Sequence, residues 1–142
     1  PNVVCCSAAV SACEKGGQWS RALDLLFGMA RLRVSPNVVS YSAAVSACAK
    51  GGKWQHALAL LCRMSPLRIQ PNVVSCSAAI SACEKCSQWR IALAVLGSMA
   101  RLRVQPNAIT LNAAARACER GGKQQLFVLE HFGLHGQLKA AP

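Results

Sequence analysis

The sequence predicts an all-α fold in which four helical hairpins stack side by side as an α-solenoid. The first observation is that the motif Pro-Asn-Val-Val, or its variant Pro-Asn-Ala-Ile, recurs every 35 residues, at Pro1, Pro36, Pro71 and Pro106. The second is that apolar residues within each copy follow helical spacing instead of the alternation typical of a strand. The third is the composition, since a chain that is 53% hydrophobic and 15% charged can form a packed core.

Each copy of the motif predicts two helices. The first begins after Pro-Asn, because an asparagine such as Asn2 can cap free backbone N–H groups. Small residues at helical spacing, including Ala8 and Ala12, allow close helix packing, and Gly16-Gly17 ends the helix in a turn. The second helix starts near a tryptophan and presents one apolar stripe, formed in the first copy by Trp19, Ala22, Leu23, Leu26 and Met29.

The period also predicts the domain organisation. We expect repeats at residues 1–35, 36–70 and 71–105, and a partial or degenerate repeat or C-terminal cap at 106–142. In the fourth copy Gln124 replaces the tryptophan and Phe127 replaces a recurring alanine. The chain does not begin with Met and opens with no leader pattern, so we expect it to be a segment of a longer protein.

Charge and cysteine content narrow the class of protein. Lys and Arg number 16 against 5 Asp and Glu, and the net charge of +11 predicts attraction to polyanions, although it can also serve solubility alone. No uncharged run approaches the roughly 20 residues that cross a bilayer, so we expect no membrane partner. Four of the nine cysteines recur at the repeat interval and are expected to be small packing residues in a reducing compartment: Cys13, Cys48, Cys83 and Cys118.

Few residues suggest catalysis or metal binding. Cys83 and Cys86 form a lone CxxC, and His131 and His135 lie four residues apart without a third ligand, so neither pair predicts a metal site. His56 has no counterpart in the other repeats and is expected at the surface. Without a nucleophile, a base and an orienting partner, we predict no enzyme and no cofactor. Three recurring glutamates are expected to be exposed partners of nearby cations: Glu14, Glu84 and Glu119.

The segment Pro-Asn-Val-Val-Ser-Tyr-Ser-Ala-Ala at Pro36, with Ala57-Leu58 and Met64 in the second helix, resembles the pentatricopeptide repeat. The resemblance covers about residues 1–123. Tetratricopeptide repeats are the nearest alternative, but their period is about 34 residues and their tryptophan lies in the first helix. The motif Ala-Ala-(Val/Ile)-Ser-Ala-Cys-Glu-Lys-Gly-Gly-Gln-Trp is similar to the repeats of pentatricopeptide proteins from dinoflagellate algae. The resemblance implies a right-handed solenoid located in a plastid or mitochondrion.

The resemblance further implies binding of single-stranded RNA, with one base per repeat read by two side chains along the first helices. In the family, a small hydroxyl residue combined with Asn resembles the pair that favours adenine, which implies a preference for three consecutive adenines. The alternative is that each Asn only caps its helix and each Ser bonds its own backbone. The implied pairs are Ser7/Asn37, Ser42/Asn72 and Ser77/Asn107, with Asn112 lacking a clear partner.

Two further sets resemble residues that contact RNA in the family. The aliphatic residues resemble those that sandwich each base, although they are equally compatible with an ordinary core, and only Tyr41 supplies an aromatic ring nearby. The cations at the end of each first helix resemble a phosphate contact, or alternatively interact with the helix dipole. The aliphatic set is Val4, Val39, Val74 and Ile109, and the cations are Lys15, Lys50, Lys85 and Arg120.

The predicted function is therefore sequence-selective RNA binding in the processing, editing, stability or translation of an organellar transcript. The alternative is a scaffold for protein–protein interaction, in which the charge only aids solubility. Salt dependence distinguishes the two, because four neutralised phosphates predict a slope of log affinity against log salt of roughly −2 to −3.

Overall fold

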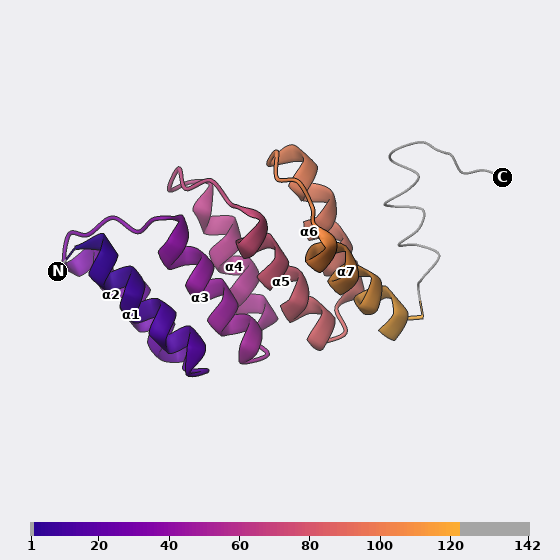
Figure 1. Ribbon diagram of the computed structural model, residues 1–142, viewed down its shortest axis with the longest axis horizontal. Coiled ribbons are helices and arrows are strands. Elements are labelled where there is room, and N and C mark those ends of the chain that lie inside the picture. Colours follow the sequence, from indigo (N-terminus) through magenta and orange to yellow (C-terminus); the bar gives the residue numbers. More distant parts are fainter. Residues whose placement is uncertain (1, 123–142) are drawn as a thin grey trace.

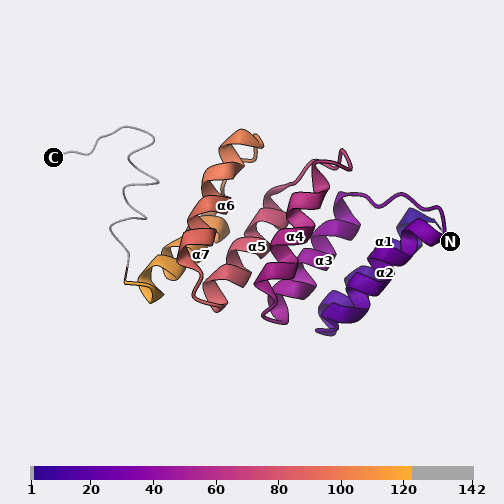
Figure 2. The same cartoon turned by 180° about the vertical axis from the view of Figure 1, so that it is seen from behind.

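The computed structural model describes residues 2–122, which fold into seven α-helices without a strand (Figure 1). The hairpins are α1–α2, α3–α4 and α5–α6, followed by α7, and they succeed one another along the long axis of the molecule. In the views from front and back, α1 and α7 lie at opposite ends (Figures 1 and 2). The helices are α1 (Val3–Lys15), α2 (Trp19–Arg31), α3 (Val38–Lys50), α4 (Trp54–Met64), α5 (Val73–Lys85), α6 (Trp89–Arg101) and α7 (Ala108–Arg120).

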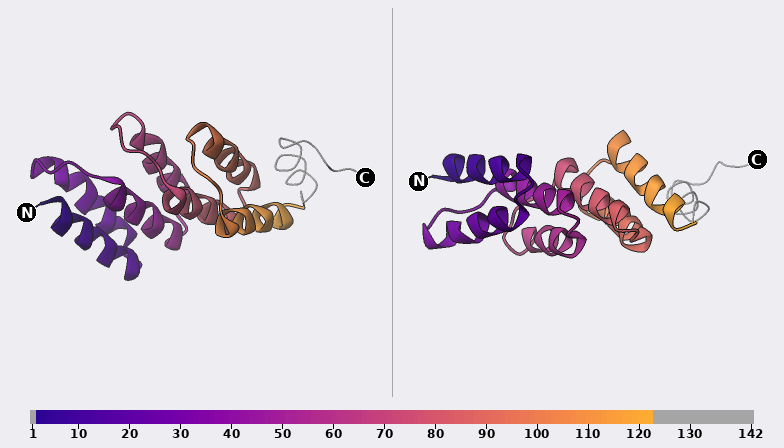
Figure 3. Two further views of the ribbon diagram at one scale, coloured as in Figure 1. Left: turned by 45° about the horizontal axis from the view of Figure 1, so that its top comes forward. Right: turned by 90° about the horizontal axis from the view of Figure 1, so that it is seen from below.

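The helices form two layers. The first helices make one continuous layer, because α1 contacts α3, α3 contacts α5, and α5 contacts α7. Each second helix packs on its own first helix and on the first helix of the next repeat, and no two second helices contact each other within residues 2–122. Seen from below, α1 and α3 lie on one side of the molecule and α2 and α4 on the other (Figure 3). The prediction of an all-α solenoid of helical hairpins is confirmed.

An asparagine begins every first helix, as the sequence predicts. The side-chain oxygen of each accepts a hydrogen bond of 2.9 to 3.0 Å from the backbone N–H three residues later. In three repeats a hydroxyl at that later position returns a bond to the asparagine backbone and completes a capping box. The asparagines are Asn2, Asn37, Asn72 and Asn107, and the returning hydroxyls belong to Ser40, Ser75 and Thr110.

Glycine in the left-handed region closes most of the turns between the two helices of a hairpin. Gly17, Gly52 and Gly122 have φ of 70°, 71° and 66°. In the third repeat Cys86-Ser87 replaces Gly-Gly, and Ser87 adopts φ 58°. Its neighbour Cys86 donates an S–H hydrogen bond of 3.3 Å to the carbonyl of Gly52 in the preceding repeat.

The core lies between the two layers. The methionine and first alanine of each second helix are almost fully enclosed, with Met64 and Ala57 both 0% exposed. The helices α3 and α5 are covered by neighbours on both sides, so their small residues are buried on most faces. Of the recurring cysteines, Cys48, Cys83 and Cys118 are buried, and all nine thiols are free.

The tryptophans that begin the second helices, Trp19, Trp54 and Trp89, are only partly buried. Two of the three rings lie against the turn of the next repeat. A methyl group on Gly51 would lie 2.5 Å from Cδ1 of Trp19, so the indole occupies the space that a side chain at Gly51 would need. Trp89 stands in the same relation to Gly121. The ring therefore joins one repeat to the turn of the next.

Some predictions fall on residues 123–142, outside the described part of the chain. These concern the degenerate half of the fourth repeat, with Gln124 and Phe127, and the histidine pair His131 and His135. Among the helices that the structure does describe, none has the length and apolar character needed to cross a membrane.

Candidate nucleic-acid interface

The serines and asparagines that the resemblance pairs are neighbours in space. The hydroxyl of Ser7 donates to the side-chain oxygen of Asn37 at 3.3 Å, and Ser42 donates to Asn72 in the same way at 3.4 Å. Each hydrogen bond joins residues 30 positions apart, so it connects one repeat to the next. The alternative in which these serines bond only their own backbone is wrong for Ser7 and Ser42.

Helix capping fixes the orientation of each asparagine amide. Because Oδ1 of Asn37 accepts from the backbone N–H of Ser40, the other end of the amide, Nδ2, must point away from the helix. Neither Asn37 nor Asn72 has a hydrogen-bond partner for Nδ2 among residues 2–122. The serine hydroxyl donates its hydrogen to Oδ1, and its oxygen can still accept a hydrogen bond. Each pair therefore presents one free donor and one free acceptor.

The predicted base-sandwiching residues lie on the surface. Their exposed fractions are 72% for Val4, 53% for Val39, 54% for Val74 and 63% for Ile109. The alternative that they are core residues is wrong, since the core is built from the opposite face of each first helix. Tyr41 is 2% exposed and cannot stack on a base. The face therefore carries one exposed aliphatic side chain per repeat and no accessible aromatic ring within the described residues.

A pocket of about 260 Å³ is lined by residues of the second, third and fourth repeats and brings several of these residues together. Ser77 and Asn107 line it without the direct hydrogen bond of the other two pairs. Ser46 and Ser81 also line it, and the sequence analysis missed both. Their signal was spacing, because each follows a paired serine by four residues and so shares its helix face. Val74 and Ile109 complete the apolar part of the lining.

The cations at the ends of the first helices are exposed, but they differ in their partners. Lys50 lies 2.5 Å from the carboxylate of Glu14, and Arg120 lies 3.0 Å from that of Glu84. Lys15 and Lys85 have no acidic partner among residues 2–122. The expectation that Glu84 is exposed is wrong.

The glutamates themselves differ in exposure. Glu84 is 6% exposed because Arg120 and Arg116 of the next repeat cover its carboxylate. Glu14 is partly exposed and Glu119 is exposed.

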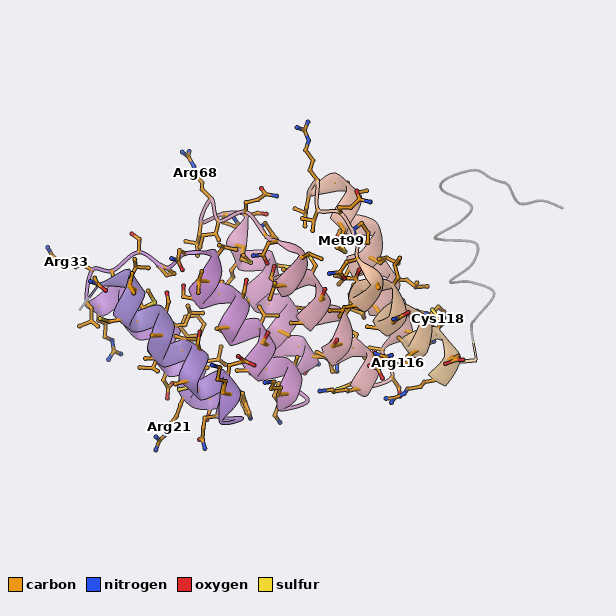
Figure 4. All side chains as sticks on the ribbon, in the orientation of Figure 1. Arg21, Arg33, Arg68, Met99, Arg116 and Cys118 are labelled. Carbon is orange, nitrogen blue, oxygen red and sulfur yellow. The ribbon has the colours of Figure 1, made fainter. Side chains whose placement is uncertain are left out.

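Further arginines lie along the edge where one hairpin is linked to the next. Arg33 and Arg68 project away from the helices at this edge, whereas Arg21 lies at the other edge (Figure 4). Arg33, Arg68 and Arg103 adopt left-handed backbone conformations with φ of 58° to 60° in the links. These exposed charges extend the positive potential of the molecule beyond the first helices.

The described residues form no group of three side chains suited to hold a metal ion. Burial, reinforced by the neighbouring Cys86, raises the pKa of Cys83 to about 12. That thiol stays protonated near neutral pH, so it is a poor metal ligand and a poor nucleophile. His56 is exposed, as predicted, and its ring centroid lies 5.2 Å from that of Trp19.

Solved structures of similar fold come from plants. The pentatricopeptide repeat protein PPR10 from maize is 28% identical, with a TM-score of 0.71, and the match covers 80% of this chain and 16% of that one. PPR10 in complex with an 18-nt psaJ RNA element matches at 22% identity and a TM-score of 0.74, covering 91% of this chain and 21% of that one.

The PPR domain of Arabidopsis thaliana protein-only RNase P 1, in complex with tRNA, matches at 19% identity and a TM-score of 0.68. That match covers 86% of this chain and 65% of the domain. The chain therefore spans only a part of each of these proteins. No curated protein sequence shows a significant match.

Sequence models of the repeat match most of the described residues. The model of the PPR repeat matches residues 4–34 and 39–65, and that of the pentatricopeptide repeat domain matches residues 59–120. The two matches of the PPR repeat coincide with the hairpins α1–α2 and α3–α4, and all the matches together extend over more than half of the chain. The chain belongs to the pentatricopeptide repeat family.

Proposed function

We propose that this array binds single-stranded RNA along the layer of first helices, with one base per repeat read by a serine–asparagine pair that joins that repeat to the next. The family and its solved relatives support RNA binding by such repeats, since one relative was solved with an 18-nt RNA element. In this proposal the array acts in the processing, editing, stability or translation of an organellar transcript, without catalysis of its own.

The observation that carries the proposal is the geometry of the serine–asparagine pairs. Ser42 and Asn72 present a free N–H donor and a free hydroxyl acceptor within the described residues, at the start of α5, whose first turn also carries the exposed side chain of Val74. The Watson–Crick edge of an unpaired base also offers donors and acceptors side by side, and its ring faces are apolar. One such pair at each boundary between repeats gives the one-base register.

Adenine is the base that the family code assigns to this pair. Its edge offers a ring-nitrogen acceptor for the asparagine amide and an amino donor for the serine oxygen. A single donor and a single acceptor can also be matched by other bases, so the preference for adenine comes from the resemblance to the family.

The test is binding of the full chain to labelled oligo-A, oligo-U, oligo-C and double-stranded RNA over a series of salt concentrations. We expect tightest binding to oligo-A and weak binding to the duplex, whose base edges are already paired. Affinity for oligo-A should fall as salt rises. Equal binding to every RNA would leave a nonspecific basic solenoid and contradict base reading.

A matched pair of variants distinguishes the exposed face of the first helices from the rest of the surface. Val74 and Leu32 are both 54% exposed, so replacing either with serine leaves the core intact. Val74→Ser should weaken oligo-A binding because the base loses an apolar contact, whereas Leu32→Ser should not. Equal effects of the two changes would place the RNA elsewhere. Absence of RNA binding at low salt would favour the alternative function, a scaffold for a protein partner.

A further inference from the structure

In two repeats the residue before the end-of-helix cation pairs with the corresponding cation of the next repeat. Glu14 pairs with Lys50 at 2.5 Å, and Glu84 pairs with Arg120 at 3.0 Å. In the second repeat this position is Ala49, which carries no carboxylate, and Lys85 therefore has no acidic partner within residues 2–122. Of the four end-of-helix cations, Lys50 and Arg120 are therefore held by an ion pair with the preceding repeat. Lys15 and Lys85 have no such ion pair within residues 2–122, and we call them free.

The held cations are fixed in place. Arg120 makes an ion pair with the carboxylate of Glu84 and also donates to the backbone carbonyl of Glu84 at 3.0 Å. Arg116 lies 3.7 Å from the same carboxylate, which is only 8% exposed. Lys50 is paired with a carboxylate that is 20% exposed. A phosphate approaching any of these cations would meet a carboxylate of the same charge, so each offers little attraction.

Lys85, which has no acidic partner in the part of the chain that the structure describes, also lies on the same face of α5 as two serines of the pocket. Ser77, Ser81 and Lys85 are successive fourth residues of α5, so they share one face of that helix. Ser77 and Ser81 line the pocket, and Lys85 lies one turn, about 5 to 6 Å along the axis, beyond Ser81. A base in the pocket would therefore have Lys85 within reach of its backbone phosphate.

We propose that the acidic partner from the preceding repeat decides which cations bind RNA phosphate, and that Lys85 binds it whereas Lys50 and Arg120 do not. This inference rests on the proposed RNA binding. Lys15 also has no acidic partner among the described residues, but the residues that would precede it by one repeat lie outside this sequence, so the inference is drawn for Lys50, Lys85 and Arg120. Adding a carboxylate at the residue before the cation of one repeat should therefore pair the free cation of the next repeat. Removing a carboxylate there should free a cation that is now paired.

Two variants of the full chain test the conversion. Ala49→Glu places a carboxylate opposite Lys85 and should weaken oligo-A binding about fivefold, the effect of losing one exposed charge contact. Glu14→Ala frees Lys50 and should tighten binding by a similar factor. Matched controls make the same charge changes on second helices: Ala59→Glu in α4 and Asp24→Ala in α2, both at exposed positions. These controls should shift affinity less than their partners.

Removing the cations gives an independent measurement. Lys85→Ala should reduce the slope of log affinity against log salt by about 0.7, whereas Lys50→Ala should leave it unchanged. In the Lys85→Ala background, Ala49→Glu should have no further effect. Equal losses from Lys50→Ala and Lys85→Ala would overturn the inference, as would an unaltered affinity of a folded Ala49→Glu variant. A melting temperature equal to that of the unmodified chain would show that the Ala49→Glu variant is folded. We expect this result because the first, third and fourth repeats carry Glu at this position.

A measurement without RNA separates failure of this inference from failure of the proposed function. Acetylation of exposed lysines should modify Lys85 faster than Lys50 in the unmodified chain, and Ala49→Glu should slow the reaction at Lys85. Equal rates would overturn the assignment of held and free cations even if RNA binds. If the lysines react at the expected rates but the chain does not bind RNA, the proposed function and the phosphate contact are both contradicted. The assignment of the ion pairs would then still stand.

Discussion

At the scale of single residues, one asparagine performs two tasks. Asn72 caps α5 through Oδ1, accepts from Ser42 of the preceding repeat, and leaves Nδ2 free. The capping requirement fixes which end of the amide faces outward, so a structural role determines the chemistry offered to a ligand. This explains why the capping and base-reading interpretations of the sequence do not exclude each other.

The substitution Asn72→Asp should change base preference without unfolding the array. A carboxylate also caps helices, but it replaces the free N–H donor with an acceptor. The preference at that position should move away from adenine, toward bases that present an N–H there, namely guanine or uracil. Binding to oligonucleotides with a single changed base measures the shift. Unaltered preference in a folded variant would show that Asn72 does not read a base.

The buried thiols predict a loss of stability at high pH. Burial raises the pKa of Cys48 to about 11 and that of Cys83 to about 12, from 9.0 in the unfolded chain. Below pH 9 both states hold the protons, and above it the unfolded chain releases them first. The free energy of unfolding should therefore fall from pH 9 upward, by at most about 1.4 kcal/mol per pH unit for each thiol.

Urea unfolding at several pH values measures this dependence. The double variant Cys48→Ala and Cys83→Ala is the control, and its unfolding free energy should fall less steeply above pH 9, whatever its absolute stability. Parallel curves for the two proteins would show that the thiols do not contribute.

At the scale of helices and turns, a tryptophan ring of one repeat packs against a glycine, which has no side chain, in the turn of the next repeat. The indole of Trp19 lies against Gly51, the first residue of the next turn, and the equivalent ring of Trp89 lies against Gly121. The third repeat has Cys86 at this position, and its thiol bonds to Gly52 instead. At Gly51 and Gly121 the close approach of the ring therefore leaves no room for a side chain, in addition to the demands of the turn itself.

The substitution Gly51→Ala should destabilise the array by about 1 to 3 kcal/mol, because the new methyl group overlaps the ring of Trp19. Gly16→Ala is a close control. It has the same place in the first repeat and a similar φ, −86° against −83°, but its nearest neighbour would be 3.5 Å away. Thermal unfolding should show a lower Tm for the first variant and little change for the second. Equal Tm values would show that the ring moves aside at no cost.

At the scale of the whole molecule, contacts link each repeat only to its neighbours, so position in the array affects local stability. Nine residues of α3 are buried, but only Ser7 and Val10 in α1, although the two helices have nearly the same sequence. The difference arises because α3 is covered on both sides and α1 on one.

Hydrogen exchange should follow this order. Backbone amides of α3 and α5 should exchange more slowly than those of α1, since opening a central repeat disrupts two boundaries and opening a terminal repeat disrupts one. Mass spectrometry of peptides from the three helices measures the rates. Uniform protection of α1 and α3 would indicate that the array opens only as a single unit.

The sequence by itself determined the repeat, the helix boundaries and the family. These features follow from local chemistry: asparagine caps, glycine turns and apolar spacing act within a few residues, and 35-residue periodicity repeats the signal along the chain. The serine–asparagine pairs were also predictable, but only through the resemblance to the family, because the partners lie 30 residues apart.

Only the tertiary structure decided which surfaces are exposed and which charges are paired. Val74 and Val73 are adjacent valines, yet the first is 54% exposed and the second packs against the core, since stacking of repeats covers one face of each helix. Glu84 is buried by arginines of the following repeat, and Lys85 is left free because Ala49 lies in the repeat before it. Such contacts depend on how adjacent repeats pack against each other, and local sequence patterns do not specify that packing.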